Sequence, residues 1–192
     1  SSGETFFSEQ DFLEERVHSK FEINESVRDF INRNHLKLTE TREVLDRFRS
    51  LKVTVIGDLI VDEYVNCHPL GMSSEDPLVV NSPISSLKYV GGAGIVAAHC
   101  AAFGAKTNFI SVIGDDEVGN WATNKIIEYG VNAHIEKDYS RATILKQRFR
   151  SNKQTLFRLS HITNNPLDLN LRRIIGERIL ELIKDSDILI CS

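Results

Sequence analysis

The sequence predicts an α/β protein whose mostly parallel sheet is flanked by helices, and three observations lead to this prediction. From Leu51 onward, short apolar runs rich in β-branched residues alternate with stretches whose apolar residues recur at helical spacing. Apolar residues make up 41% and charged residues 26% of the chain, which excludes collagen, coiled-coil fibres and wholesale disorder. A length of 192 residues is enough for one ordinary domain with a sizeable core.

The first fifty residues differ in texture from the remainder. Residues 1–50 contain no proline and no glycine beyond Gly3, and their apolar residues follow helical intervals between many charges. This pattern predicts a helical N-terminal extension, with helices over about 8–21, 24–31 and 39–48.

The main domain is predicted over residues 51–192. It begins with a β-branched run that ends at Gly57-Asp58, which is typical of a buried strand that reaches a turn. The alternating polar residues that follow predict half-exposed strands, and glycines then open an Ala-rich helix. The predicted elements are strands over 52–58, 78–80, 84–90 and 106–114, and helices over 95–103 and 115–129.

The last part of the chain continues the alternation. Strands are predicted over 131–135, 143–150 and 154–159, followed by a helix after Asp168 with the 3.6-residue apolar period and a buried strand over 187–191. Because a buried strand normally leads into another layer, we expect the sequence to be the front portion of a larger domain, truncated on its C-terminal side.

Composition limits the classes of partner that the protein is expected to bind. The net charge of −4 lacks the basic excess of a nucleic-acid-binding protein, and no apolar run approaches the roughly 18 residues needed to span a bilayer. The three cysteines, Cys67, Cys100 and Cys191, are scattered and odd in number, which favours reduced thiols and a cytoplasmic location. No Cys or His pairing has metal-ligand spacing, so no metal site is predicted.

Two acidic residues are the first candidates for binding. Asp58 lies at the end of the first strand, where open parallel sheets bind ligands, and Asp62 follows four residues later. Carboxylates in this place can accept hydrogen bonds from sugar hydroxyls. The alternative is that Asp58 caps a turn and Asp62 is solvated.

The glycines before the Ala-rich helix are the second candidate. Gly91 and Gly92 let a ligand approach the backbone, and amides at a helix start attract anions or hydroxyl oxygens. Residues 92–97 also satisfy the dinucleotide fingerprint G-x-G-x-x-A, with Asp115 and Asp116 at the end of the next strand. That fingerprint requires a buried strand directly before the glycines, and the preceding residues are alternately polar.

Basic residues in the two late strands are the third candidate. The set is Lys146, Arg148, Arg150 and Arg158. Lys146 and Arg148 are two residues apart, so in a strand they project from the same face and suit a phosphorylated ligand. The alternative is an exposed strand edge guarded by charge.

In their order along the chain, these features resemble the ribokinase-like (PfkB) carbohydrate kinases. The matching stretches are 53–64, 73–80, 90–97, 103–105 and 143–148, and the resemblance runs from about Leu51 to Ser192. Within that family, the chain is most similar to the kinase part of bacterial enzymes that act on heptose 7-phosphate.

The resemblance implies a central sheet with a small β-sheet lid over the sugar, with lid strands at about 64–90 and 143–160. It also implies a possible homodimer through this lid. The implied substrate-binding residues are Asp58, Asp62, Gly91, Gly92, Lys146 and Arg148, the carboxylates holding sugar hydroxyls and the cations facing the ligand or its phosphate.

The resemblance further implies ATP and Mg²⁺ as cofactors and a catalytic aspartate in a late Gly-Ala-Gly-Asp motif. This motif does not occur in the sequence. We therefore expect no catalytic residue in this chain, the base and most of the nucleotide site beyond Ser192, and no activity from the fragment alone.

The expected function is ATP-dependent phosphorylation of a hydroxyl of a sugar or sugar phosphate, most like that of a heptose-7-phosphate kinase. One departure is that Ile95 stands where the family signature carries Asn. It favours, as an alternative, a non-catalytic carbohydrate-binding or regulatory homologue. A nucleotide-binding oxidoreductase domain is the third alternative.

Overall fold

The structure, a computed structural model, describes residues 25–152, 154–163 and 165–192. Contacts divide the chain into two units, Ser1–Val44 and Leu45–Ser192. Helices α1 (Glu25–Arg33) and α2 (Leu38–Phe48) confirm two predicted helices of the extension, and the one expected over 8–21 lies outside the described residues. The division falls within α2 rather than after residue 50. The end of α2 belongs to the second unit, where the ring of Phe48 lies 5.5 Å from that of Phe103.

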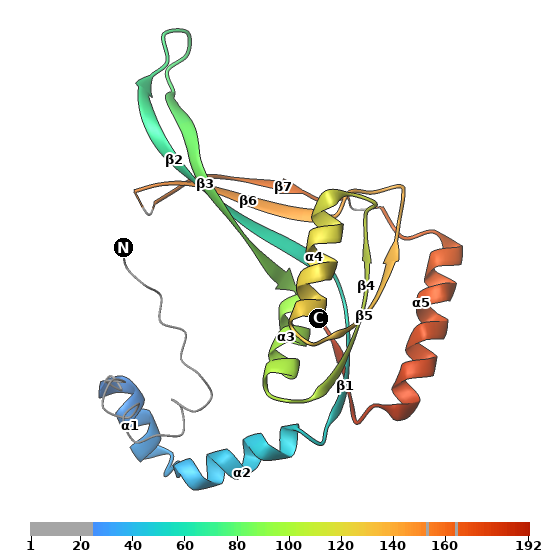
Figure 1. The fold of residues 1–192 in the computed structure, drawn as a ribbon. Coiled ribbons are helices and arrows are strands. Elements are labelled where there is room, and N and C mark those ends of the chain that lie inside the picture. The colour runs from blue at the N-terminus through green and yellow to red at the C-terminus, as the bar shows by residue number, and fades with distance from the viewer. Residues whose placement is uncertain (1–24, 153, 164) are drawn as a thin grey trace. The chain divides into compact units, whose positions relative to one another are not determined.

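The second unit contains a four-stranded parallel sheet with the order β5-β4-β1-β8. Its strands are β1 (Lys52–Ile56), β4 (Lys106–Ile113), β5 (Asn132–Lys137) and β8 (Ile188–Cys191). Helices α3 (Ala93–Ala102) and α4 (Glu117–Glu128) lie on one side and α5 (Leu169–Leu182) on the other (Figure 1). Right-handed crossover connections require helices on both sides of the sheet. From β1 the chain moves along the sheet to β4 and β5 in one direction, and it then returns past β1 to β8 in the other.

The core lies between β1, β4 and the helices α3 and α4. β1 is central and buried on both faces, as its β-branched sequence predicts, and the hydroxyl of buried Thr54 bonds to the Ser186 hydroxyl at 2.7 Å. Alanines on α3 allow that helix to approach the sheet closely. The residues of this core include Val53, Val55, Leu59, Val61, Ala93, Ala97, Phe109, Ile113, Ala122 and Ile126.

A second four-stranded sheet, with the order β3-β2-β6-β7, corresponds to the predicted lid. Its strands are β2 (Leu59–Met72), β3 (Val79–Gly92), β6 (Ile144–Ser151) and β7 (Gln154–His161). β2 runs antiparallel to β3 and parallel to β6, and β6 runs antiparallel to β7. We call it the lid sheet. The predicted α/β fold class with a lid is confirmed.

Two boundaries of the lid sheet differ from the prediction. β2 begins at Leu59, so Asp62 lies inside a strand rather than before the lid. β3 is one continuous strand, although Pro83 interrupts the sequence pattern, because Pro83 lies opposite Cys67 at a register shift in β2. A proline without an N–H is tolerated at such an irregularity.

Two further predictions about the second unit are corrected. α3 begins at Ala93, so Gly94 is part of the helix and packs against Leu59 and Val90. β8 is not buried: Ile188 and Leu189 are exposed, because β8 is an edge strand with β1 as its neighbour.

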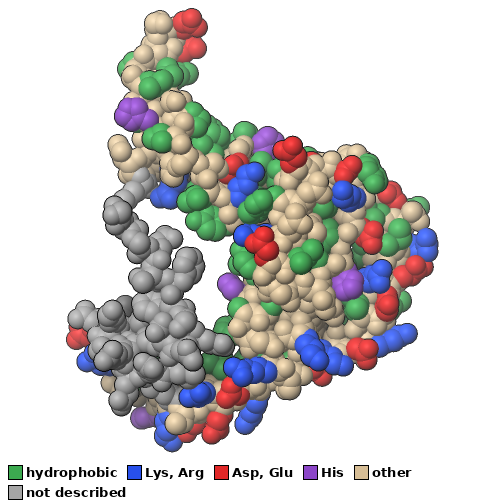
Figure 2. All heavy atoms as spheres, in the orientation of Figure 1, with side chains coloured by type: hydrophobic (Ala, Val, Ile, Leu, Met, Phe, Trp, Pro, Cys, Tyr) green, Lys and Arg blue, Asp and Glu red, His purple; other side chains and the backbone are tan. Residues whose placement is uncertain are grey.

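The hairpin of β2 and β3 extends away from the parallel sheet (Figure 1). Apolar side chains gather along it in Figure 2, and the exposed ones include Leu70, Met72, Leu78, Val79, Val80 and Ile84. In the described part of the chain, no helix combines the length and apolar content needed to cross a membrane.

Candidate functional site

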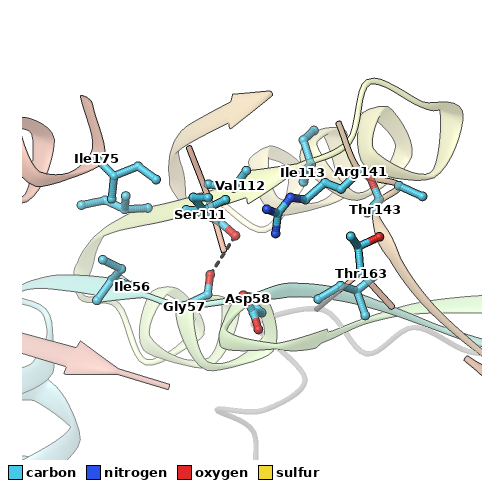
Figure 3. A pocket seen from close by; sticks show the side chains of 14 residues that line it. Ile56, Gly57, Asp58, Ser111, Val112, Ile113, Arg141, Thr143, Thr163 and Ile175 are labelled. Carbon is cyan, nitrogen blue, oxygen red and sulfur yellow. Dashed lines mark hydrogen bonds between the residues drawn. The ribbon is translucent and has the colours of Figure 1, made fainter. Parts of the chain in front are cut away.

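The turn between β1 and β2 places Asp58 at the carboxyl end of the central strand. Buried Ser111 of β4 holds this turn: its hydroxyl accepts from the Leu59 amide at 3.0 Å and donates to the Gly57 carbonyl at 2.8 Å (Figure 3). The exposed Asp58 lines a cavity of about 190 Å³ whose other polar side chains include Arg141 and Thr163. Its wall is mostly apolar and comes from β1 and the β1–β2 turn, β4, the segment 141–144, and Thr163, Leu167 and Ile175.

Arg141 is fixed at the edge of this cavity. Its Nε donates to Asp138 Oδ2 at 2.6 Å and its Nη2 to the Asn165 carbonyl at 3.0 Å, and its side chain extends toward the cavity in Figure 3. Hydrogen bonds from the Ser140 hydroxyl and amide, together with Arg141, hold the pKa of Asp138 below its ordinary value. Asp138 is therefore an ionised anchor for the guanidinium at neutral pH.

Asp116 ties the start of β6 to the end of β4. Its Oδ1 accepts from the Gly119 amide at 2.7 Å, which caps α4, and its Oδ2 accepts from the Thr143 amide at 2.8 Å. Burial opposes ionisation of Asp116, but these hydrogen bonds outweigh it and lower its pKa. The Gly114 amide in turn donates to the Thr143 hydroxyl at 3.0 Å. Asp116 therefore fixes where β6 begins, and with it the residues that follow along the strand.

Asp62 and Arg148 form an ion pair across the lid sheet. The register of β2 and β6 places Asp62 beside Lys146 and Tyr64 beside Arg148. Arg148 Nη1 donates to Asp62 Oδ1, and the two side chains are only 24% and 23% exposed. This hydrogen bond raises the pKa of Arg148, and its guanidinium also lies 5.2 Å from the centre of the Tyr64 ring. The pair is thus held at one place on the sheet.

Gly91 and Gly92 lie between the two predicted carboxylates. A Cβ on buried Gly91 would overlap Asp62 Oδ2, so glycine is what leaves room for this carboxylate. Gly92 has φ 58° and ψ −142°, and the next amide, that of Ala93, donates to the Asp58 carbonyl at 3.0 Å. The first amide of α3 is therefore engaged and not available to a ligand, contrary to the expectation for this helix start.

Two hollows lie on the same face of the lid sheet, on either side of the Asp62–Arg148 pair. The first, of about 450 Å³, is lined by Asp62, Tyr64, Asn66, Leu87, Tyr89 and Arg150. The second, of about 240 Å³, is lined by Lys146, Gln147, Arg148, Arg158 and Ser160. We call them the tyrosine hollow and the basic hollow.

The structure thus brings together part of the predicted site. Asp62, Gly91, Lys146 and Arg148 lie on neighbouring strands of the lid sheet, whereas Asp58 lines the cavity beside β1. Neither the cavity beside β1 nor either of the two hollows is lined by all six predicted residues, and their roles toward a ligand remain predictions. Tyr64 and Tyr89 were not predicted as site residues. Tyr64 lies two residues after Asp62 on β2, and Tyr89 lies two residues before Gly91 on β3, so the alternation along each strand could have indicated them.

The dinucleotide-binding alternative is contradicted by the geometry. The strand before the glycines is β3, which is antiparallel to its neighbour and belongs to the lid sheet, whereas the fingerprint requires a strand of the parallel sheet. Asp116 caps α4, and Asp115 pairs with Lys137 at 2.7 Å. Both carboxylates thus already have partners within the chain.

Comparisons with known proteins agree with this fold. No protein-family model matches the sequence. The chain is 32% identical over 148 residues to bifunctional protein HldE of Methylococcus capsulatus, a match over 74% of this chain and 31% of the relative. It is 29% identical over 157 residues to HldE of Paramagnetospirillum magneticum, covering 81% and 32% of the two chains. The chain therefore spans about a third of the length of these relatives.

Solved carbohydrate kinases share its architecture. A carbohydrate kinase from Agrobacterium tumefaciens has a TM-score of 0.58 and 20% identity, covering 73% of this chain and 45% of the kinase. Phosphofructokinase-2 from Escherichia coli, solved with fructose-6-phosphate, has a TM-score of 0.55 and 15% identity, covering 74% and 45%. The predicted resemblance is thereby confirmed: the chain is similar in sequence to part of HldE, and most of it has the fold of carbohydrate kinases.

Proposed function

We propose that this chain supplies the sugar-binding part of an ATP-dependent PfkB-type carbohydrate kinase that phosphorylates a hydroxyl of a sugar or sugar phosphate. Among such enzymes we propose heptose-7-phosphate kinase activity, which the similarity to HldE supports. The observation that carries the proposal is the Asp62 carboxylate, fixed by Arg148 and partly exposed beside Gly91 on the lid sheet.

The ion pair holds the Asp62 carboxylate in place, whereas a solvated aspartate would be free to turn. Arg148 holds Oδ1, which limits the orientations of the carboxylate, and Oδ2 lies against Gly91, where a Cβ would overlap it. Each carboxylate oxygen has lone pairs for more than one donor, so Asp62 can accept hydrogen bonds from sugar hydroxyls while paired. Phosphoryl transfer depends mainly on the positioning of the reacting groups, and a carboxylate held in place can position a sugar through its hydroxyls.

The remaining predicted residues have supporting roles in this proposal. Lys146 lies beside Asp62 in the strand register and faces the ligand, and Asp58 accepts hydrogen bonds near the end of β1. Gly91 and Gly92 keep the backbone close to the sugar.

ATP would supply the phosphoryl group and Mg²⁺ would neutralise its charge. Among the described residues, no three His, Cys, Asp or Glu side chains are grouped to hold a metal ion. We propose that the catalytic base and most of the nucleotide site lie outside this sequence, and that the chain alone binds sugar without turning over ATP. A cytoplasmic location and a homodimer through the lid sheet are parts of the same proposal.

Isothermal titration calorimetry on the 192-residue chain tests the proposal. We expect D-glycero-D-manno-heptose 7-phosphate to bind, and Asp62→Asn to weaken binding at least about tenfold, the loss of one charged hydrogen-bond acceptor. Asp76→Asn, the same change in the exposed loop between β2 and β3, is the matched control and should bind normally. Normal binding by Asp62→Asn, or no binding by the unmodified chain, contradicts the proposal.

A non-catalytic sugar-binding regulator is the second candidate, because Ile95 occupies the first turn of α3 where the kinase signature carries Asn. Turnover of ATP by the complete gene product with heptose 7-phosphate as acceptor excludes this candidate. Tight sugar binding without any turnover supports it.

A further inference from the structure

The tyrosine hollow leaves one aromatic ring largely uncovered. Tyr89 lies on β3 directly opposite Asp62 of β2, lines this hollow and is 51% exposed. The volume of the hollow, about 450 Å³, lies within the range of about 300–1,000 Å³ that is typical of small-molecule sites.

The second tyrosine of the hollow holds Tyr89 in place. The rings of Tyr64 and Tyr89 meet edge to face, with their centroids 5.7 Å apart and their planes at 83°. The guanidinium carbons of Arg148 and Arg150 lie 5.2 and 5.7 Å from the centre of the Tyr64 ring, close enough for cation–π attraction. Tyr64 is therefore engaged by two cations. Within the described ranges, Tyr64 is the one ring that contacts Tyr89.

Tyr89 and Asp62 offer complementary chemistry to a sugar. A sugar ring has hydroxyls around its edge and faces made of C–H groups. The carboxylate accepts hydrogen bonds from the hydroxyls, and an aromatic ring removes the C–H groups from water and presents them with its electron-rich face. Because directly opposed residues of an antiparallel pair have Cβ atoms about 4.5–5.5 Å apart, a sugar ring on Tyr89 has its hydroxyls within reach of Asp62.

We propose that Tyr89 is a specificity-determining residue whose ring is a platform for the C–H face of a sugar ring bound through its hydroxyls to Asp62. This inference rests on the proposed function. It adds that the lid sheet selects a cyclic sugar over an open-chain polyol, a distinction that a carboxylate alone does not make because both kinds of molecule carry hydroxyls.

The competing explanation is that Tyr89 is part of a surface covered by another protein molecule, because exposed aromatic residues are also enriched at protein interfaces. In that case, replacing Tyr89 changes self-association and leaves the choice between ligands unaffected. A platform for a sugar ring changes that choice, and it also changes the magnetic environment of the ligand's C–H protons, which an aromatic ring shields when they lie over its face.

The experiment compares D-glycero-D-manno-heptose 7-phosphate with the heptitol 7-phosphate obtained from it by reduction, which keeps the phosphate and the carbon chain but has no ring. In isothermal titration calorimetry on the full chain, we expect the cyclic sugar to bind at least about fivefold more tightly, the strength of one aromatic contact. Tyr89→Ser should remove most of this preference, whereas Tyr89→Phe should keep it because the ring face remains. Tyr139→Ser, which replaces an 81% exposed tyrosine in the turn after β5, is the matched control and should change nothing.

Proton NMR of the bound sugar provides the second measurement. The ring C–H protons should move upfield on binding to the unmodified chain and to Tyr89→Phe, but not on binding to Tyr89→Ser. If Tyr89→Ser does not fold, Tyr89→Leu keeps an apolar side chain without a ring and should lose the same upfield shift.

The outcomes separate this inference from the proposed function. An unchanged ligand preference and unchanged proton shifts in Tyr89→Ser overturn the platform while sugar binding stands. Binding that depends on Tyr89 as expected, combined with no phosphorylation by the complete gene product, supports the platform and contradicts the kinase activity. If the unmodified chain binds neither ligand, both proposals fail.

Discussion

Gly92 and Gly91 are adjacent, yet the same substitution is expected to affect mainly stability at Gly92 and mainly ligand binding at Gly91. Gly92 combines φ 58° with ψ −142°, a region that residues with a Cβ essentially do not populate. A methyl group there would also meet the Asp58 carbonyl, which is backbone and cannot turn away, and Ile60 Cδ1 at 3.0 Å. Gly92→Ala therefore stresses the connection between β3 and α3.

The magnitude follows from these contacts. Backbone strain of this kind costs about 1–3 kcal/mol. For a chain of this size, 1 kcal/mol lowers the melting temperature by roughly 2–4 °C, so Gly92→Ala should melt roughly 2–12 °C below the unmodified chain. At Gly91, by contrast, the methyl group overlaps one carboxylate oxygen of Asp62, and the next atoms, Asp62 Cγ and Ile60 Cβ, lie at ordinary contact distances of 3.5 and 3.7 Å. Gly91→Ala should displace the carboxylate, cost about 1 kcal/mol or less, and weaken sugar-phosphate binding.

Differential scanning calorimetry and titration calorimetry on both variants separate the two effects. Gly176→Ala on α5, where a methyl group meets nothing within 4 Å, is the control and should stabilise the chain by about 0.5–1 kcal/mol. The reasoning is refuted if Gly92→Ala melts with the unmodified chain, or if Gly91→Ala binds the ligand normally.

Three further predictions concern the groups that position the site. Arg148→Met leaves the half-buried Asp62 carboxylate unpaired and should lower the free energy of unfolding in urea by about 1–2 kcal/mol. The control Arg173→Met, in an exposed ion pair, should cost less than about 0.5 kcal/mol, and equal costs would contradict the role of Arg148. Hydrogen bonds to Asp116 lower its pKa in the folded chain, so its stabilisation is complete above the unfolded pKa of about 3.8 and is lost as the pH falls through the folded pKa. Asp116→Asn should be destabilised at pH 7, and this deficit in the free energy of unfolding should shrink as the pH falls below about 3.8; a constant deficit in urea titrations would be inconsistent with this role. Ser111→Ala leaves a buried amide and carbonyl of the β1–β2 turn without partners and should cost about 2 kcal/mol, so a variant with unchanged urea stability shows that the hydroxyl does not hold the turn.

Elements with strong local signals were predictable from the sequence. The apolar period and Asp168 place α5, and the Asp168 carboxylate does cap it, accepting from the Leu171 amide at 2.9 Å. β1 and β4 follow from β-branched runs that end in glycine. Each of these signals lies within a few consecutive residues, so it can be recognised without knowing which distant segments pair.

Features that depend on distant pairing were less predictable. The pattern left the start of β2 ambiguous because Asp62, Glu63 and Asn66 are polar, and the strand is fixed by partners in β3 and β6. β8 has the composition of a buried strand, but its exposure depends on what lies beside it, and composition does not encode that.

The candidate site shows the same limit. The spacing of Lys146 and Arg148 correctly indicated a shared strand face, but the partner of Arg148 is Asp62, 86 residues earlier. The pairing of Arg158 opposite Arg148 depends on the register of β6 and β7, which the sequence does not specify. For this reason the sequence identifies Arg158 as a cation of a late strand but does not show which residue lies opposite it.

The most direct test of the account is a titration of the ¹⁵N-labelled chain with heptose 7-phosphate, followed by amide chemical shifts. The amides of Asp62, Gly91, Lys146 and Arg148 are expected to shift together and to saturate with one dissociation constant. Shifts confined to the cavity beside β1, or no shifts on the lid sheet at all, would contradict it.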